Sequence, residues 1–200
     1  LGRLTAEAAL AHVAPRRLVL ITREPARLAD LAARGAQVRH GDFDQAGTLR
    51  DAFAGVERLL LISAVDLARR TQQHRTAIDA AGAAGVRHIA YTSMLSPTEA
   101  NPAAVAPSHR ETEAALRASG VSWTLLRNSL YADYQAPEAQ QAISTGRFVH
   151  NRGSGRSAYV ARADCAAAAA AVLTSTGHEN VAYDITGPRT EVAELVGVPR

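Results

Sequence analysis

The residues RLLLIS at positions 58–63 and HIAYTS at positions 88–93 decide the fold, because each is a short and almost continuous apolar run. Such runs are typical of strands that are buried on both faces of a sheet. The segment between them, residues 66–84, has a helical pattern that stops at Gly85. Strand, helix and strand in this order predict a parallel pair joined by a right-handed crossover.

The same alternation continues on both sides of this unit. Before it we expect helices over residues 4–13, 25–34 and 48–53, and strands over residues 18–22 and near Val38. After it we expect a helix over residues 108–118 and a strand over residues 122–127. Buried strands separated by amphipathic helices predict an α/β fold with a doubly wound parallel sheet of the Rossmann type.

Beyond residue 127 the alternation is less regular. The expected elements are a helix over 131–144 that breaks at Pro137, an extended stretch over 146–151, a turn at 153–155, a helix capped by Asp164 that ends near 175, a strand over 181–186 and a helical fragment over 191–196. We therefore expect a sheet domain over residues 1–130. Residues 131–200 would form a smaller lobe that is interleaved with the last sheet strands.

Composition excludes several classes of protein. The chain has 200 residues, of which 47% are hydrophobic and 20% are charged, as in globular domains. The longest apolar run, residues 165–173, is too short to span a bilayer, so no membrane association is expected. Cys165 is the single cysteine, which excludes an internal disulfide. Residues 1–3 show neither an initiator methionine nor a signal peptide, and we expect a cytoplasmic protein.

All 22 basic residues are arginine, because the sequence contains no lysine. This excludes a Schiff-base lysine, a P-loop lysine and the Tyr-x-x-x-Lys pair that many dehydrogenases use. The net charge is +3, but the arginines occur singly or in pairs, so no nucleic-acid partner is expected. No G-x-S-x-G motif is present, which argues against a serine hydrolase.

Ligands of doubly wound sheets bind outside the carboxyl ends of the strands. This rule selects five segments, at residues 22–23, 41–44, 62–63, 91–93 and 127–128. Arg23 ends one strand, where an arginine pairs with the 2′-phosphate of NADP(H), whereas an acid binds the 2′-hydroxyl of NAD(H). Because Glu24 comes only one step later, NADPH is preferred over NADH. The alternative for Arg23 is an ordinary surface arginine.

Asp42 and Phe43 follow the next strand, where a carboxylate can meet the adenine amino group and an aromatic ring can lie along the adenine. Their alternative is a turn residue beside a core phenylalanine. Ser63 either places a small side chain against the middle of the cofactor or acts only as a helix cap. Gly2 is either a remnant of a Gly-rich phosphate loop or an ordinary helix N-cap.

Tyr91, Thr92 and Ser93 are the strongest candidates for chemistry, because hydroxyls at the end of a central strand can donate to a carbonyl that accepts hydride. His109 lies at the start of the following helix. An imidazole there could replace the missing lysine by orienting the nicotinamide ribose or relaying a proton. Its alternative is a solvent-exposed helix histidine. The remaining histidines form no i, i+4 pair, so no metal is predicted.

Three runs together resemble one family: VRHGDFD at 38–44, AGVERLLLIS at 54–63 and GVRHIAYTS at 85–93. In this order they resemble the NmrA-like atypical short-chain dehydrogenases, and within them the flavin-free NADPH:quinone oxidoreductases and triphenylmethane reductases. The run WTLLRN at 123–128, Tyr131 and the run RAD at 162–164 extend the likeness to about residue 187.

The resemblance implies a Rossmann domain that binds NADPH, a small C-terminal substrate lobe, and hydride transfer to a quinone-like or dye-like acceptor, without flavin or metal. Carried over by position, Arg23 meets the 2′-phosphate, Asp42 and Phe43 the adenine, Ile62 and Ser63 the central cofactor, Thr92, Ser93 and His109 the nicotinamide end, and Asn128 and Tyr131 the substrate cleft. Ser93, His109 and Tyr131 are the candidates for catalysis.

Members of this family begin with a strand and a T-G-A-T-G-x-L-G loop, of which residues 1–2 match only the end, and they continue beyond residue 187. We therefore expect the N-terminal phosphate loop and part of the C-terminal lobe to be missing from this sequence. The expected partners are a small-molecule electron acceptor and a second copy of the chain in a homodimer. Two alternatives are a redox-sensing regulator of the NmrA type without turnover and, more weakly, a sugar-nucleotide epimerase.

Overall fold

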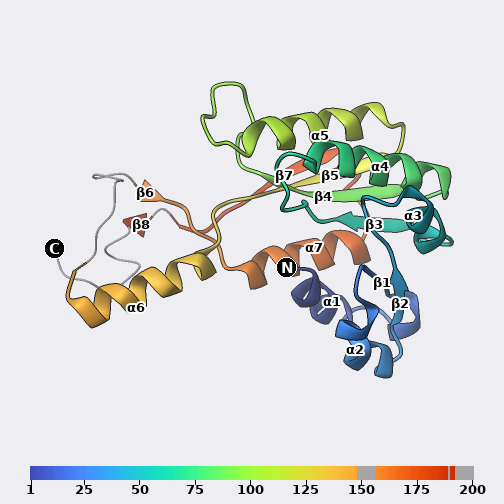
Figure 1. Ribbon diagram of the computed structural model, residues 1–200, viewed down its shortest axis with the longest axis horizontal. Coiled ribbons are helices and arrows are strands. Elements are labelled where there is room, and N and C mark those ends of the chain that lie inside the picture. Colours follow the sequence, from blue (N-terminus) through green and yellow to red (C-terminus); the bar gives the residue numbers. More distant parts are fainter. Residues whose placement is uncertain (148–155, 189, 192–200) are drawn as a thin grey trace.

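The computed structural model describes residues 1–147, 156–188 and 190–191, and two parallel sheets form its centre (Figure 1). The smaller sheet pairs β1 (Val19–Thr22) with β2 (Gln37–His40). The larger sheet has the order β3 (Arg58–Leu61), β4 (His88–Met94), β5 (Ser122–Asn128) and β7 (Val181–Ile185). All paired strands in both sheets are parallel, so the carboxyl ends of β3, β4 and β5 lie at one edge.

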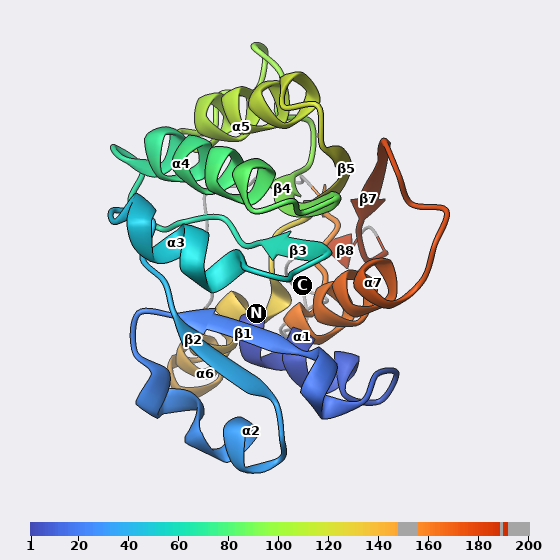
Figure 2. The same cartoon turned by 90° about the vertical axis from the view of Figure 1, so that its right-hand side faces the viewer.

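Helices cover both faces of the larger sheet (Figure 2). One face carries α3 (Ala46–Phe53), α4 (Arg70–Ala83) and α5 (Ala106–Ala118), and the other carries α7 (Arg162–Thr174) and α1 (Gly2–Ala9). The predicted doubly wound α/β fold is therefore confirmed. Because β4 is central and covered on both sides, all its residues except Met94 are buried. Its apolar side chains join two separate clusters, one for each face.

The parallel strands are divided between two sheets rather than joined in one. Within the described residues β1 pairs only with β2, and β3 pairs only with β4. A cavity of about 850 Å³ lies between the facing edges and is lined by Leu20 and Ile21 of β1, Leu59 and Leu60 of β3, and Ala6 of α1. All four residues of β1 are consequently only half-buried.

The connections around β1 are short. η1 (Pro15–Arg17) leads into β1, and η2 (Pro25–Leu28) followed by α2 (Ala29–Ala33) leads on toward β2. In the C-terminal part, η3 (Ala132–Gln135) and α6 (Ala136–Thr145) project away from the sheets beside the antiparallel pair of β6 (Arg156–Ser157) and β8 (Thr190–Glu191) (Figure 1). The chain returns through α7 to β7, and a domain boundary near residue 131 stays a prediction.

Several expected helix boundaries were wrong. The first helix ends at Ala9, four residues earlier than expected. The helix expected from residue 66 begins only at Arg70. The Asp66 carboxylate accepts hydrogen bonds from the backbone N–H of Ala68 at 3.1 Å and from Nε of Arg69 at 2.7 Å. These bonds hold a turn in front of the helix.

Three further expectations of the C-terminal part were also wrong. Pro137 lies in the first turn of α6 instead of breaking it, as its missing N–H allows. Asp164 does not cap α7, because the Asp133 carboxylate accepts from the backbone N–H of Arg162 at 2.8 Å. Glu191 lies in a strand, not in a helical fragment. Residues 148–155 and 192–200 lie outside the described residues, and most of the expected extended stretch, the expected turn and most of the helical fragment fall on them.

In the part of the chain that the structure describes, no helix is both long and apolar enough to cross a membrane. The same residues contain no group of three or more His, Cys, Asp or Glu side chains that could hold a metal ion. Cys165 is buried in α7, and burial raises the pKa of its thiol to about 11.

Candidate functional site

The first turn of α1 lies against the end of β3. Gly2 is the first residue of α1, and a Cβ added to it would lie 3.2 Å from Cδ1 of the half-buried Ile62. No side chain caps the helix at Leu1, so the first backbone N–H groups of α1 have no capping acceptor. Free N–H groups at a helix N-terminus are suited to a phosphate. Gly2 therefore lies where a phosphate-binding residue is expected, and the alternative of an ordinary helix N-cap is wrong because Leu1 is the N-cap residue.

Arg23 directly follows β1 and is exposed. Within the described residues its guanidinium has neither an ion-pair partner nor a hydrogen-bond partner. The neighbouring acid, Glu24, is engaged, because its carboxylate pairs with Nε of Arg27 at 2.8 Å. The end of β1 thus presents an unpaired cation and a neutralised acid, which favours a phosphate over a ribose hydroxyl.

Asp42 and Phe43 lie beyond β2 and differ in their surroundings. Asp42 is half-buried, and its Oδ1 accepts from the backbone N–H of Asp44 at 3.0 Å, as in a turn. Phe43 packs against the main apolar cluster and meets the His74 ring edge-on, with centroids 6.2 Å apart. Both residues therefore have local structural roles, and their contacts with an adenine stay a prediction.

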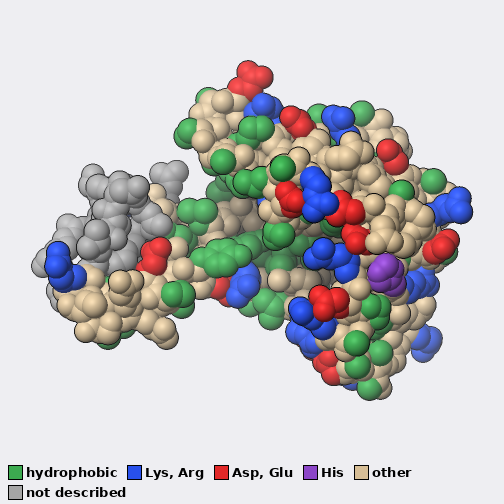
Figure 3. Space-filling model, viewed as in Figure 1, with side chains coloured by type: hydrophobic (Ala, Val, Ile, Leu, Met, Phe, Trp, Pro, Cys, Tyr) green, Lys and Arg blue, Asp and Glu red, His purple; other side chains and the backbone are tan. Residues whose placement is uncertain are grey.

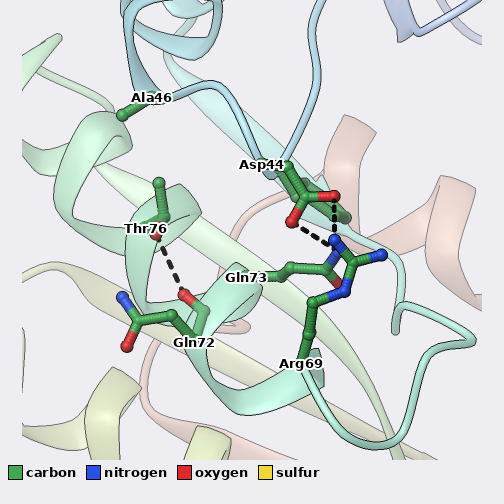
Figure 4. A pocket seen from close by; sticks show the side chains of 7 residues that line it. Asp44, Ala46, Arg69, Gln72, Gln73 and Thr76 are labelled. Atoms are coloured by element: carbon green, nitrogen blue, oxygen red, sulfur yellow. Dashed lines mark hydrogen bonds and ion pairs between the residues drawn. The ribbon is translucent and has the colours of Figure 1, made fainter.

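A cavity of about 220 Å³ lies beside Phe43, between the first turns of α3 and α4 (Figure 4). The Asp44 carboxylate holds one wall together, pairing with Arg69 at 3.0 Å and accepting from Nε2 of Gln73 at 3.0 Å. Oε1 of Gln73 is buried, and no described residue bonds to it. The sequence did not indicate Arg69 or Gln73, because both contact Asp44 only after α4 packs beside the end of β2.

The ends of β3 and β4 are joined by Ser63 and Thr92. The backbone N–H of Ser63 donates to Oγ1 of Thr92 at 2.9 Å. The cap alternative for Ser63 is wrong, because α4 begins seven residues later and has no side-chain cap. Ser93 is buried and donates to Oε1 of Glu113 at 2.7 Å. The hydroxyl proton of Ser93 is therefore directed into the protein, and only its oxygen lone pairs remain for other partners.

Glu113 of α5 is the centre of a buried ionic cluster that the sequence did not reveal. It is 2% exposed and accepts hydrogen bonds from Arg127 at 2.7 and 3.0 Å, from Arg117 at 3.0 Å and from Ser93. Burial opposes its ionisation, but the hydrogen bonds from Arg127, Ser93 and Arg117 outweigh this and lower the pKa of the carboxyl. In the sequence, only its spacing of four residues from His109, which puts both side chains on one face of the helix, indicated that Glu113 would be buried.

His109 is 6% exposed, so the alternative of a solvent-exposed histidine is wrong. Its Nδ1 lies 2.7 Å from the hydroxyl of Tyr91, and its Nε2 lies 3.4 Å from Nη1 of Arg70. Burial, followed by the charge of Arg70, lowers the pKa of His109 to about 4. Tyr91 is 0% exposed, and burial raises its pKa far above the usual value. Tyr91 therefore supports His109 and is not a proton donor at the surface of the site.

Asn128 and Tyr131 lie at and just beyond the end of β5. Nδ2 of Asn128 donates to the Tyr131 hydroxyl at 3.1 Å, while Oδ1 of Asn128 is buried and has no partner among the residues that the structure describes. Burial raises the pKa of the half-buried Tyr131. Hydrophobic side chains gather in the hollow between the projecting C-terminal lobe and the body of the protein (Figure 3). Next to Tyr131 along the chain, Leu130 is exposed, and the ring of the exposed Tyr134 lies 5.9 Å from that of Tyr131. The arrangement offers a phenol next to an apolar surface.

The predicted residues thus fall into two groups. Ser63, Thr92, Ser93 and Asn128 lie at successive strand ends of the larger sheet, whereas Arg23 and Asp42 lie beyond the smaller sheet. Ser93 and His109 do not bond to each other, because Glu113 holds one and Tyr91 the other. The carboxyl edge thus carries an exposed cation beyond β1, fixed polar groups at the centre of the larger sheet and a half-buried phenol beyond β5.

Comparison with known proteins identifies relatives that share this arrangement of the chain. A model of an NAD(P)H-binding family matches residues 1–176. Quinone oxidoreductase 2 of Escherichia coli strain K12 is 42% identical over 187 residues, which are 94% of this chain and 65% of the relative. The chain therefore spans just under two thirds of that relative's length.

Two solved structures are also similar. The NADPH-dependent quinone oxidoreductase of Escherichia coli complexed with NADPH has a TM-score of 0.92 and 40% identity, over 97% of this chain and 69% of that one. The triphenylmethane reductase of Citrobacter sp. complexed with NADP(H) has a TM-score of 0.91 and 38% identity, over the same shares. The resemblance drawn from the sequence is confirmed.

Proposed function

The chain belongs to the NAD(P)H-binding family whose family model matches residues 1–176. From that premise we propose that the protein is an NADPH-dependent reductase of quinone-like or dye-like acceptors. The observation that carries the proposal is the set of fixed polar groups at the ends of β3, β4 and β5. It occurs in a chain that superimposes on two NADP(H)-bound reductases with TM-scores of 0.92 and 0.91. When bound, NADPH supplies the hydride.

The described residues fit such a cofactor. Arg23 offers an exposed guanidinium without a competing carboxylate, which suits a 2′-phosphate better than the hydroxyl of NADH. The uncapped N–H groups at Gly2 suit the diphosphate. Ile62 and Ser63 would border the centre of the cofactor, and Asp42 and Phe43 its adenine. We expect no flavin and no metal in this reaction.

At the nicotinamide end, we assign fixed positions rather than proton transfer to Thr92, Ser93 and His109. Thr92 is held by the N–H of Ser63, and Ser93 by Glu113, so both hydroxyl oxygens keep one orientation. Groups fixed in advance lower the entropy cost of bringing a donor and an acceptor together. Burial of these side chains also keeps water away from the reacting carbon.

Tyr131 is the residue we assign to the acceptor. Its oxygen already receives a hydrogen bond from Asn128, which leaves its own O–H free to donate to an acceptor oxygen. The apolar hollow beside it suits a flat, weakly polar molecule (Figure 3). Such a hydrogen bond would strengthen as negative charge grows on that oxygen during reduction.

The first experiment follows NADPH oxidation by the full-length protein with a small quinone and with a triphenylmethane dye, beside NADH and a reaction without acceptor. Acceptor-dependent oxidation that prefers NADPH supports the proposal. Saturable NADPH binding without oxidation of any acceptor contradicts it and favours a redox-sensing regulator. Tyr131→Phe should lower kcat about tenfold or more with the quinone. Tyr183→Phe removes a phenol oxygen whose ring packs against the sheet cluster of Ala90 and Leu126, and as the matched control it should keep the wild-type kcat.

Two expectations about the protein's surroundings also stay proposals. We propose a cytoplasmic location, supported by the single cysteine, and a homodimer. Cell fractionation and sedimentation of the full-length protein test them directly. A membrane-bound fraction would contradict the first, and a monomer at all concentrations the second.

A further inference from the structure

A buried polar cluster joins α4, β4 and α5 behind the nicotinamide end of the site. Its members are between 0% and 7% exposed: Arg70, His74, Tyr91, His109 and Thr112. Arg70 is the cation of the cluster and has no carboxylate partner within the described residues. Burying a guanidinium without a counterion has an unfavourable desolvation free energy, so the hydrogen-bond partners of Arg70 must stabilise its charge.

The partners of Arg70 are all acceptors. Its Nε donates to the carbonyl of Ala64 at 2.5 Å, and its Nη1 faces Oγ of Ser108 at 3.3 Å and Nε2 of His109 at 3.4 Å. A guanidinium only donates hydrogen bonds. Nε2 of His109 must therefore carry a lone pair rather than a proton.

This assignment fixes the other nitrogen of His109. A neutral imidazole has one protonated nitrogen, so the proton lies on Nδ1 and is donated to the Tyr91 hydroxyl oxygen at 2.7 Å. The Thr112 hydroxyl donates to the carbonyl of Ser108 at 2.8 Å, so its proton is engaged inside α5.

The hydrogen bonds of His74 assign its protonated nitrogen in the same way. Its Nε2 accepts from the backbone N–H of Ala64 at 2.9 Å, so its Nδ1 carries the proton and donates to Oγ1 of Thr112 at 2.9 Å. The imidazole protons of His74 and His109 and the hydroxyl proton of Thr112 are thus already donated to internal acceptors. The two imidazoles can hold a group in place, but they have no proton to give to a ligand.

We propose that Arg70 is a positioning residue that holds His109 as the neutral imidazole protonated on Nδ1, and thereby excludes His109 as the proton donor in reduction of the acceptor. The consequence for the reaction rests on the proposed reductase function, but the protonation state of His109 does not. The proton that balances hydride addition to the acceptor then comes from water or from Tyr131.

The charged and titratable groups that face His109 agree with this state. Arg70 and His74 approach from α4, Tyr91 from β4 and Glu113 from α5 itself. Burial lowers the pKa of His109 most, Arg70 lowers it further, and only Glu113 acts in the opposite direction. Removing Arg70 should therefore raise the pKa of His109 and free its Nε2.

The direct test is long-range ¹H–¹⁵N NMR of the histidine rings in the full-length protein, with His109 assigned from the signals that His109→Gln removes. The expected pattern is a neutral ring with Nδ1 protonated throughout about pH 5.5 to 8. A ring protonated on Nε2, or one that becomes cationic in this range, would overturn the proposal. This readout needs no turnover, so it is interpretable even when no acceptor is reduced.

Variants of α4 separate positioning from general stability. Arg70→Met should move His109 to mixed tautomers and introduce an ionisation into the pH profile of kcat that the wild-type protein lacks. Arg70→Lys keeps a donor and a charge and should restore the wild-type tautomer at least in part. Arg75→Met, on the exposed side of the same helix, should change neither. An Arg70→Met protein with unchanged ring signals would contradict the proposal.

Discussion

The two ends of the candidate cofactor site are built in opposite ways. Beyond β1, Arg23 is exposed and has no partner in the described part of the chain. At the ends of β4 and β5, the polar groups are buried and bonded to one another through Glu113 and through His109. Recognising a phosphate requires one accessible charge, whereas fixing a reactive ring requires groups that cannot move. The comparison predicts different outcomes for substitutions at the two ends.

The largest effect is expected at the buried end, from Glu113→Gln. The substitution removes the charge that offsets Arg127 and Arg117 and weakens the acceptor of Ser93. Breaking a buried ionic cluster on one side should lower the free energy of unfolding by about 3 kcal/mol or more. Urea denaturation measures this loss in the free energy of unfolding. Glu111→Gln, exposed on the same helix, is the control, and equal losses in both variants would contradict the comparison.

A second effect at the buried end is a dependence of stability on pH. His74 is 0% exposed, and burial together with Arg70 and His109 lowers its pKa from 6.5 to about 3. At pH values between about 3 and 6.5, His74 is protonated in the unfolded chain but neutral in the folded protein. Stability should therefore fall as the pH drops below about 6.5, by about 1.4 kcal/mol per pH unit for such a histidine.

Denaturation of His74→Gln at several pH values checks this slope. The variant should be less stable near neutrality, because it loses the bond from Ala64, but its stability should depend less on pH. His12→Gln removes an exposed histidine and should keep the wild-type slope. A wild-type protein whose stability is constant between about pH 6.5 and 4 would show that His74 is protonated when folded.

The difference between the two ends also explains what the sequence could predict. The strands were predictable because β4 and its neighbours are continuous apolar runs. The position of Arg23 directly after β1 was predictable because a strand end is a local property, whereas its contact with a phosphate stays a prediction. The helix that begins at Arg162 was misjudged, since its N-terminal acceptor, Asp133, is 29 residues away. The partners of Glu113 and His109 come from other elements and leave no local pattern.

A smaller effect, on binding rather than stability, is expected from Arg23→Ala. Loss of a charge-assisted contact to the 2′-phosphate should weaken NADPH binding about 10- to 100-fold and leave NADH binding nearly unchanged. Fluorescence titration with both cofactors measures the ratio, and Arg50→Ala on α3 controls for overall charge. Equal weakening of NADPH and NADH would remove Arg23 from the phosphate site.

The smallest effect is expected from Arg69→Ala, which gives the comparison its sharpest control. Like Glu113, Arg69 joins two oppositely charged side chains, Asp44 at 3.0 Å and Asp66 at 2.7 Å, but its side chain is 60% exposed. Ion pairs in contact with water contribute little, because solvent screens them and the long side chain loses entropy on pairing. Urea denaturation should therefore give a free energy of unfolding within error of the wild-type value. A loss as large as that of Glu113→Gln would show that the number of ion pairs, not their burial, decides stability at this edge.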